Sequence, residues 1–125
     1  MAKKIIMKID ILGTEYKVYT DSSVNDDRLR RNDGYIIPEK KIIILDQDNS
    51  KVHQQHVIKH EIVHAFCYES GLDVESWANN EETIDWIAIQ LFKMSSTVKD
   101  SLNVLKGVSY GRKNWEDIPD VWREC

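Results

Sequence analysis

The feature that most constrains this chain is the five-residue segment His60–His64, which reads His-Glu-Ile-Val-His. Its two histidines are four residues apart, so on a helix their side chains lie one above the other and can converge on a single point. Zinc accepts imidazole nitrogens as ligands at roughly 2.0–2.1 Å. The segment therefore predicts a helix at this position, with His60 and His64 as two ligands of one zinc ion.

The same geometry places Glu61 beside the metal. At about 3.6 residues per turn, Glu61 lies about 100° around the helix from His60 and about 60° from His64. Its carboxylate would flank the ion rather than bind it, and could take a proton from water that zinc has made more acidic. We therefore predict that Glu61 is the general base. The alternative, an exposed helix with two histidines and no metal, stays open.

A third protein ligand is expected from the acidic segment Asn80–Asp85, because a catalytic zinc needs three protein ligands and an open position. Glu81 and Asp85 are four residues apart and share one helix face. One can bind zinc while the other accepts the second ring N–H of a ligand histidine. We favour Glu81 as the ligand. Glu82 is the rival, and some of these acids could instead only favour the helix N-terminus.

Other residues could extend or change this site. His53 and His56 fall on the same helix face as the metal histidines, which makes a second metal site conceivable, although polar residues at a helix start are the simpler interpretation. Cys67 could close the coordination shell, but a cysteine on a buried helix is usually a small hydrophobe. Cys125, near the end of the sequence, could also reach zinc. Three tyrosines are candidates for stabilising an oxyanion: Tyr35, Tyr68 and Tyr110.

The first half of the chain predicts strands. Alternating apolar residues in 5–11 and 16–20, on either side of a turn at Leu12–Thr14, indicate a β-hairpin. A second hairpin is expected around Pro38–Lys40, and its second strand, Ile42–Leu45, is apolar on both faces and should be an inner strand. We expect an α+β fold, in which a small antiparallel sheet of three to four strands packs on the metal-binding helix.

Three helices are expected after the sheet. The metal-binding helix should run from 52 to 70, with a cap among Asp48–Ser50 and an end at Gly71. A glutamate helix should follow at 80–94, and its apolar character on most sides favours a central position. A C-terminal helix should cover 97–106. The tail beyond it has no readable pattern.

The length of 125 residues suits a single domain spanning residues 1–125. The formal net charge of −4 argues against nucleic acid as the main partner, and a peptide or protein substrate is expected instead. The apolar N-terminal run is too short for a signal peptide or a membrane span. A cytoplasmic protein without membrane contact is therefore expected, of undetermined oligomeric state.

The segments His60–His64 and Asn80–Asp85 together resemble the gluzincin pattern, H-E-x-x-H followed by N-E-x-x-x-D. This likeness implies that Glu81 is the third zinc ligand and that Asp85 is the partner of a ligand histidine. The run 81–88 is also similar to the glutamate helix of the ImmA/IrrE family, small metallopeptidase-like proteins common on phages and mobile elements. The resemblance covers about thirty residues, and implies a minimal zincin-like fold whose edge strand pairs with a peptide.

The expected function is therefore a zinc-dependent endopeptidase in a phage or mobile-element regulatory setting, in which Glu61 acts as general base. One alternative is a catalytically silent zinc-binding module with a regulatory or protein-interaction role. The other is a plain binding domain in which the motif is accidental.

Overall fold

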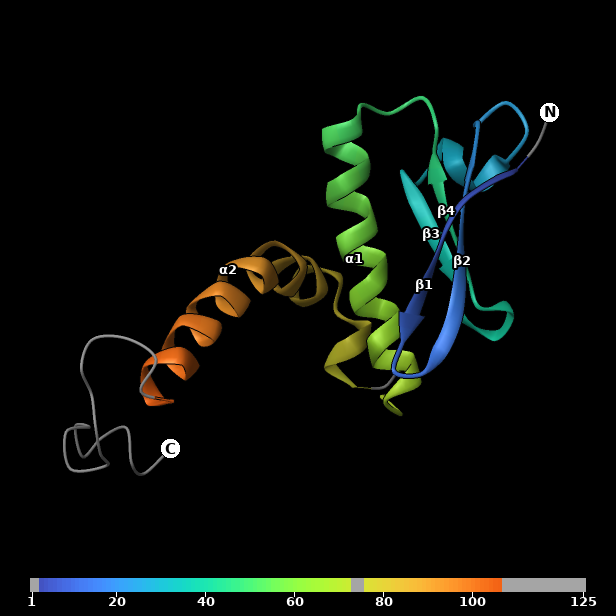
Figure 1. Cartoon of the computed structure of the whole chain (residues 1–125). Coiled ribbons are helices and arrows are strands. Elements are labelled where there is room, and N and C mark those ends of the chain that lie inside the picture. The colour runs from blue at the N-terminus through green and yellow to red at the C-terminus, as the bar shows by residue number, and fades with distance from the viewer. Residues whose placement is uncertain (1–2, 73–75, 107–125) are drawn as a thin grey trace. The chain divides into compact units, whose positions relative to one another are not determined.

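A four-stranded sheet followed by two helices forms the fold of this chain (Figure 1), and its α+β class is the one expected from the sequence. The computed structural model describes residues 3–72 and 76–106. The chain divides into two compact units, Met1–Ile89 and Gln90–Cys125. The first unit contains the whole sheet and all residues of the candidate site.

The two predicted hairpins are present. Strand β1 (Lys4–Ile11) pairs antiparallel with β2 (Thr14–Asp21). The two residues between them, Leu12 and Gly13, both have positive φ, as a tight hairpin turn requires. The second hairpin joins β3 and β4, whose bounds are Gly34–Ile37 and Ile42–Asp46, through a short 3-10 helix, η2 (Pro38–Lys40).

The sheet is mixed, so the prediction of a purely antiparallel sheet was wrong. Its strand order is β1-β2-β4-β3, and β2 pairs in parallel with β4, with Lys17 opposite Ile42. After the 3-10 helix η1 (Asp27–Arg30), β3 starts at the end of the sheet where β2 stops. It does not pair with β2, because one strand position is left between them. Strand β4 fills the gap and runs in the same direction as β2. Its residues 43–45 are buried, which confirms the predicted inner strand.

Helix α1 (Lys51–Glu69) begins and ends where local signals predict. The Ser50 side chain accepts a hydrogen bond from the backbone N–H of His53, and Gly71 has a φ of +94° just beyond the helix. One side of α1 packs on the sheet, where Val57 and Ala65 join the main hydrophobic core. The strand residues of this core are Ile11, Tyr16, Val18, Ile43 and Leu45.

Helix α2 (Glu81–Leu105) is one continuous helix rather than the two that were predicted. Residues 94–97 contain neither glycine nor proline, and the polar side chains near this point bond within the helix. The Thr97 hydroxyl, for example, donates to the carbonyl of Lys93 at 3.2 Å. A polar Ser-Ser-Thr stretch therefore does not end the helix.

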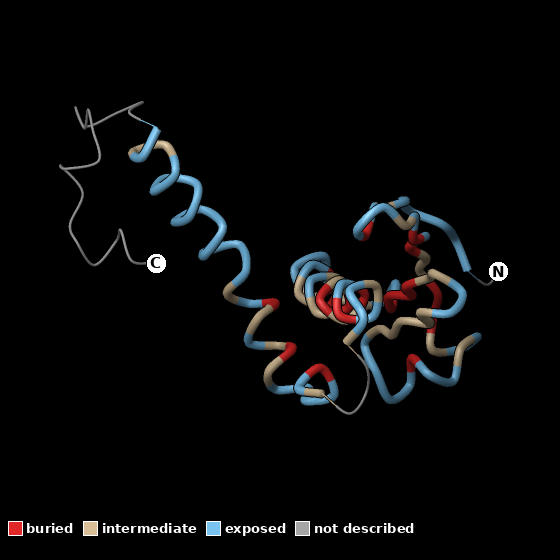
Figure 2. Tube along the Cα trace, turned by 90° about the horizontal axis from the view of Figure 1, so that it is seen from below, coloured by how far each residue is buried: buried red, intermediate tan, exposed pale blue. Residues whose placement is uncertain are grey.

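A second hydrophobic cluster joins α1 to the first turns of α2. Val63 and Cys67 of α1 pack with Ile84 and Ala88 of α2 and with Ala78 of the 3-10 helix η3 (Trp77–Asn79). A central position was expected for the glutamate helix, but most of the large apolar side chains of α2 are exposed, as the pale blue turns in Figure 2 show. Within the described residues, neither helix is long and apolar enough to cross a membrane.

Candidate metal centre

Three side chains from α1 and α2 converge in the first unit. Nε2 of His60 lies 2.9 Å from Oε1 of Glu81, and Nε2 of His64 lies 3.2 Å from the same oxygen. One ligand atom from each of the three residues lies within 4.8 Å of the others. His60, His64 and Glu81 therefore form a group that could hold a metal ion.

The two nitrogen-to-oxygen separations are near those expected around a tetrahedral ion. Two ligand atoms bound at about 2.0–2.1 Å with tetrahedral angles lie about 3.3 Å apart, and the Nε2 atoms of His60 and His64 lie 2.9 and 3.2 Å from Oε1 of Glu81. The His60 and His64 side chains are 18% and 21% exposed, whereas that of Glu81 is 68% exposed. The group is thus held by two largely covered histidines and opens towards solvent beside Glu81.

The position of Glu81 depends on how α2 begins. Asn80 closes η3 through a bond from its backbone N–H to the carbonyl of Trp77, and its side chain accepts from the backbone N–H of Thr83 at 2.8 Å. Glu81 is then the first residue of α2. Because Ile84 and Ala88 pack against α1, the opening turn of α2 is held beside the metal histidines.

Asp85 lies beside the second ring nitrogen of His60. Its Oδ1 is 3.2 Å from Nδ1 of His60, so both ring nitrogens of His60 face carboxylates. Burial lowers the pKa of His60, but its hydrogen bonds to Glu81 and Asp85 raise it more, so the net pKa is above the usual value. Without a metal, both contacts require the protonated ring. With a metal bound, Nδ1–H would donate to Asp85 and Nε2 would be left for the ion.

Glu61 is buried, with 7% exposure, and does not belong to the metal-binding group. It lines the same cavity as His60 and Glu81. Burial raises the pKa of Glu61 to about 7; the neighbouring His60 opposes this rise and Glu81 adds to it. In the protein without metal, this carboxyl group is therefore divided between its neutral and ionised forms near neutral pH.

Two cavities lie beside the metal-binding group, one lined by His60 and Glu81 and the other by His64. The larger, about 350 Å³, is lined by His60, Glu61 and Glu81 and by polar residues including Arg31. The smaller, about 120 Å³, is lined by His64 and mainly apolar residues: Ile36, Pro38, Cys67, Tyr68, Leu72 and Ala78. The two histidines of the group thus face different chemical surroundings.

Edge strand β3 contributes to both cavities, through Gly34 to the larger and Ile36 to the smaller. A Cβ atom at Gly34 would lie 2.6 Å from Cγ1 of Val57 and 2.9 Å from the carbonyl oxygen of Ile44. Glycine therefore allows β3 to approach α1 closely at this point. The sequence analysis did not identify Gly34, since nothing in a single glycine indicates which element it approaches.

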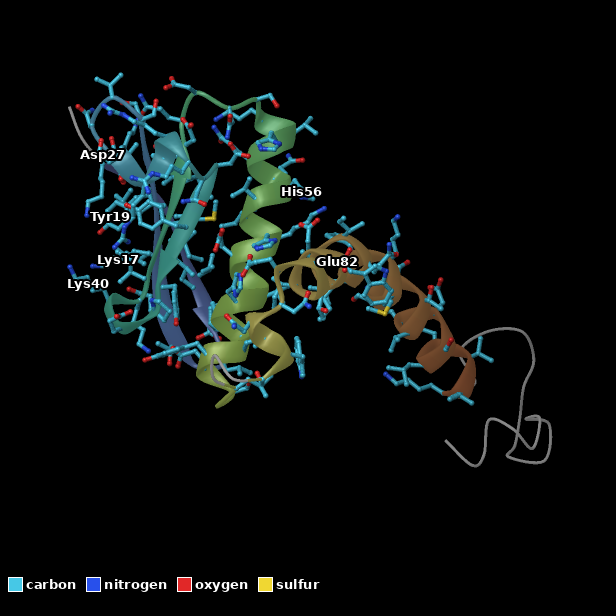
Figure 3. All side chains as sticks on the ribbon, turned by 180° about the vertical axis from the view of Figure 1, so that it is seen from behind. Lys17, Tyr19, Asp27, Lys40, His56 and Glu82 are labelled. Carbon is cyan, nitrogen blue, oxygen red and sulfur yellow. The ribbon has the colours of Figure 1, made fainter. Side chains whose placement is uncertain are left out.

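The remaining acidic and histidine candidates lie outside the metal-binding group. Glu82, labelled in Figure 3, is exposed and does not join the three ligand residues. Nε2 of His53 lies 2.7 Å from Oδ2 of Asp33, and both residues line the larger cavity without joining the three ligand residues. Nε2 of His56 lies 3.1 Å from Oδ1 of Asp85, a contact that sequence reasoning missed, although the spacing of His56 from His60 places both on one helix face.

The cysteine and tyrosine candidates are also placed. Cys67 is buried in the cluster between α1 and α2, where burial raises its thiol pKa, and it does not join the metal-binding group among the described residues. The Tyr35 hydroxyl donates to Asp26, whereas Tyr68 lines the smaller cavity beside His64. Tyr110 and Cys125 lie outside the described residues.

Comparisons of the chain with models of protein families, with curated proteins and with solved structures gave no match. The functional argument therefore rests on the residues of the site and on their geometry.

Proposed function

We propose that this chain is a zinc-dependent endopeptidase of the HExxH type. The observation that carries the proposal is the convergence of His60, His64 and Glu81 on one point, with the buried carboxyl group of Glu61 lining the same cavity. Two imidazoles and one carboxylate form the usual protein ligand set of a hydrolytic zinc site with an open fourth position. The accessibility of Glu81 to solvent is consistent with such an open site.

Each residue has a distinct part in hydrolysis. Zinc, when bound, would polarise the peptide carbonyl and acidify the attacking water. Glu61 would take a proton from that water and pass it to the leaving amine, a role supported by its position in the cavity that His60 and Glu81 also line. Asp85 accepts the Nδ1–H of His60 and so keeps Nε2 available as a ligand.

An extended peptide would bind along edge strand β3. Among residues 3–72 and 76–106, β3 pairs only with β4, and its other edge is therefore proposed to form main-chain hydrogen bonds with a substrate. Because β3 contributes to both cavities, a peptide lying on this edge would place side chains on either side of the metal-binding group. No oxyanion-stabilising residue is assigned, but Tyr68 is the described tyrosine that lies beside a ligand histidine.

The wider setting is proposed from the resemblance of two segments. His60–His64 and Asn80–Asp85 follow the gluzincin pattern, and the α2 segment is similar to that of the ImmA/IrrE family. We therefore favour a minimal zincin-like cytoplasmic protein that cleaves a regulatory protein of a phage or mobile element. The −4 net charge supports a protein rather than a nucleic-acid partner.

The test combines zinc content with a broad search for cleavage. Wild type, Glu61→Gln and His60→Ala are purified without chelator, analysed for zinc, and incubated with a peptide library derived from a bacterial proteome. We expect one zinc per chain in wild type and Glu61→Gln, and little in His60→Ala. Mass spectrometry should detect cleavage by wild type, reduced about 10²–10⁴-fold in Glu61→Gln because the general base is lost.

The other outcomes separate the alternatives. Stoichiometric zinc without cleavage, in the library and in candidate regulatory proteins, would contradict the peptidase and support a zinc-binding regulatory or interaction module. Absence of zinc from all three proteins, even after zinc is supplied, would reject both.

A further inference from the structure

The side chain of His56 contacts Asp85, and the proposed mechanism gives His56 no role. Figure 3 labels His56 on α1, one helical turn before His60. Its Nε2 lies 3.1 Å from Oδ1 of Asp85, and Nδ1 of His60 lies 3.2 Å from the same oxygen. One carboxylate oxygen is therefore shared by two histidines of α1.

Sharing this oxygen restricts the Asp85 carboxylate. Both histidine nitrogens lie within 3.2 Å of this one oxygen, and the His56 contact is an ion-pair contact rather than a hydrogen bond. Asp85 is 38% exposed and His56 is 44% exposed, so water would compete for this oxygen if His56 were absent. The His56 ring thus limits the positions that Oδ1 can take beside His60.

We propose that His56 is a positioning residue of the metal centre, which acts through Asp85 to fix the ring of His60 and thereby strengthens zinc binding. This inference rests on the proposed zinc site, but not on peptidase activity. Asp85 touches the ligand histidine directly, and groups in that position contribute about 10- to 100-fold to metal affinity. His56 is one contact further away and contributes less, on the scale of an exposed ion-pair contact.

The chain offers a matched control in His53. It lies on the same helix, is 43% exposed and contacts an aspartate, Asp33, at 2.7 Å. That pair makes no hydrogen bond or ion pair with His60, His64 or Glu81, although the His53 ring stacks on the ring of His56 with centroids 6.2 Å apart. Loss of His53 should therefore weaken zinc binding less than loss of the equally exposed His56.

The experiment measures zinc affinity by competition with a chelating indicator for wild type, His56→Ala, His56→Gln and His53→Ala. We expect about twofold to fivefold weaker binding in His56→Ala, the scale of an exposed ion-pair contact, recovery in His56→Gln, whose amide can donate to Asp85, and a smaller change in His53→Ala. Circular dichroism establishes that each variant is folded. Equal affinity of wild type and His56→Ala, or equal losses at positions 53 and 56, would overturn the proposal.

Two further measurements separate positioning from a general effect on the fold. In an Asp85→Asn background, His56→Ala should cause no additional loss of affinity, because its effect passes through Asp85; an undiminished loss would overturn the proposal. In ¹⁵N NMR of the zinc-loaded protein, the ring N–H signal of His60 should broaden in His56→Ala and persist in His56→Gln. Failure of the wild-type protein to bind zinc would reject the proposed function itself. The measurement on wild type therefore tests the zinc site, and the comparison with the variants tests the role of His56.

Discussion

Two glutamates on α1, Glu61 and Glu69, lie about two turns apart and have opposite surroundings. Glu69 accepts hydrogen bonds from Lys41 Nζ at 2.6 Å, the Tyr16 hydroxyl at 2.7 Å and the Thr14 hydroxyl at 3.2 Å. The bonds from Lys41 and Tyr16 lower the pKa of Glu69. Burial instead raises the pKa of Glu61 to about 7, and the structure shows no side-chain donor to it among residues 3–72 and 76–106.

The difference separates a structural carboxylate from a chemically available one. The donors around Glu69 come from β2 and from the residue before β4, so this glutamate ties the end of α1 to the sheet. Glu61 is buried without such donors, which destabilises its ionised form. Buried carboxyl groups with a raised pKa are common at functional sites. Because the two carboxylates have opposite surroundings, removal of each should change the stability of the protein in opposite directions.

The largest effect expected is a gain of stability in metal-free Glu61→Gln. A pKa of about 7 in the folded protein, against 4.5 for the free group, means that folding opposes ionisation of Glu61. Stability is therefore lost as pH rises from about 4.5 through 7. The loss is about 3 kcal/mol, at about 1.4 kcal/mol for each pH unit between the two pKa values. Glutamine resembles the neutral form and should avoid this loss.

Urea denaturation of chelator-treated protein at pH 4.5 and pH 8 measures this difference. Glu69→Gln is the matched control, since the same substitution two turns away removes a favourable carboxylate and should reduce stability at pH 8. Parallel pH profiles for wild type and Glu61→Gln would show that Glu61 is not disfavoured in its charged form.

The second effect is stabilisation by zinc. A bound cation near Glu61 would favour the ionised carboxylate that burial disfavours in the metal-free protein. With free zinc about 100-fold above Kd, binding to the folded state adds about 2.7 kcal/mol to the free energy of unfolding. His60→Ala should lose this gain, whereas His53→Ala should keep it. Thermal unfolding with and without zinc provides the measurement, and a zinc effect that persists in His60→Ala would place the ion elsewhere.

The smallest effect concerns the hydroxyl group that binds Glu69. Tyr16 is fully buried, and Tyr16→Phe removes its bond to the glutamate with little change in shape, at a cost of about 1–2 kcal/mol. Tyr19→Phe on the same strand is the control, because its hydroxyl makes no hydrogen bond within the described part of the chain. Urea denaturation should distinguish the two, and zinc affinity should be unchanged in both. Loss of zinc binding in Tyr16→Phe would show that the two regions are coupled.

Local signals in the sequence were sufficient for much of the fold. Ser50 and Gly71 mark the ends of α1 because capping depends on a few neighbouring residues, and the turn at Leu12–Gly13 defines the first hairpin for the same reason. The parallel pairing of β2 with β4 could not be predicted in this way. It depends on β3 taking the outer position in the sheet, which no short segment encodes.

The candidate site also has one part that local sequence determines and one part that depends on helix packing. The spacing of His60 and His64 determines that they share a helix face, so their proximity follows from the sequence. The approach of Glu81 requires α2 to pack on α1 through Ile84 and Ala88, and the contact of His56 with Asp85 requires it too. The likeness to a known pattern suggested Glu81 as a ligand, but helix packing is what places it beside the histidines.

The sequence separation of the metal-binding residues has a consequence for the order of folding. Glu81 is 21 residues from His60 and 17 from His64, whereas Glu69 is 53 residues from Tyr16 and 55 from Thr14. Bringing the ends of a shorter loop together costs less chain entropy. In the presence of zinc, we therefore expect the helical hairpin around the ion to form before the sheet closes on α1, so that the metal guides assembly as well as stabilising its product.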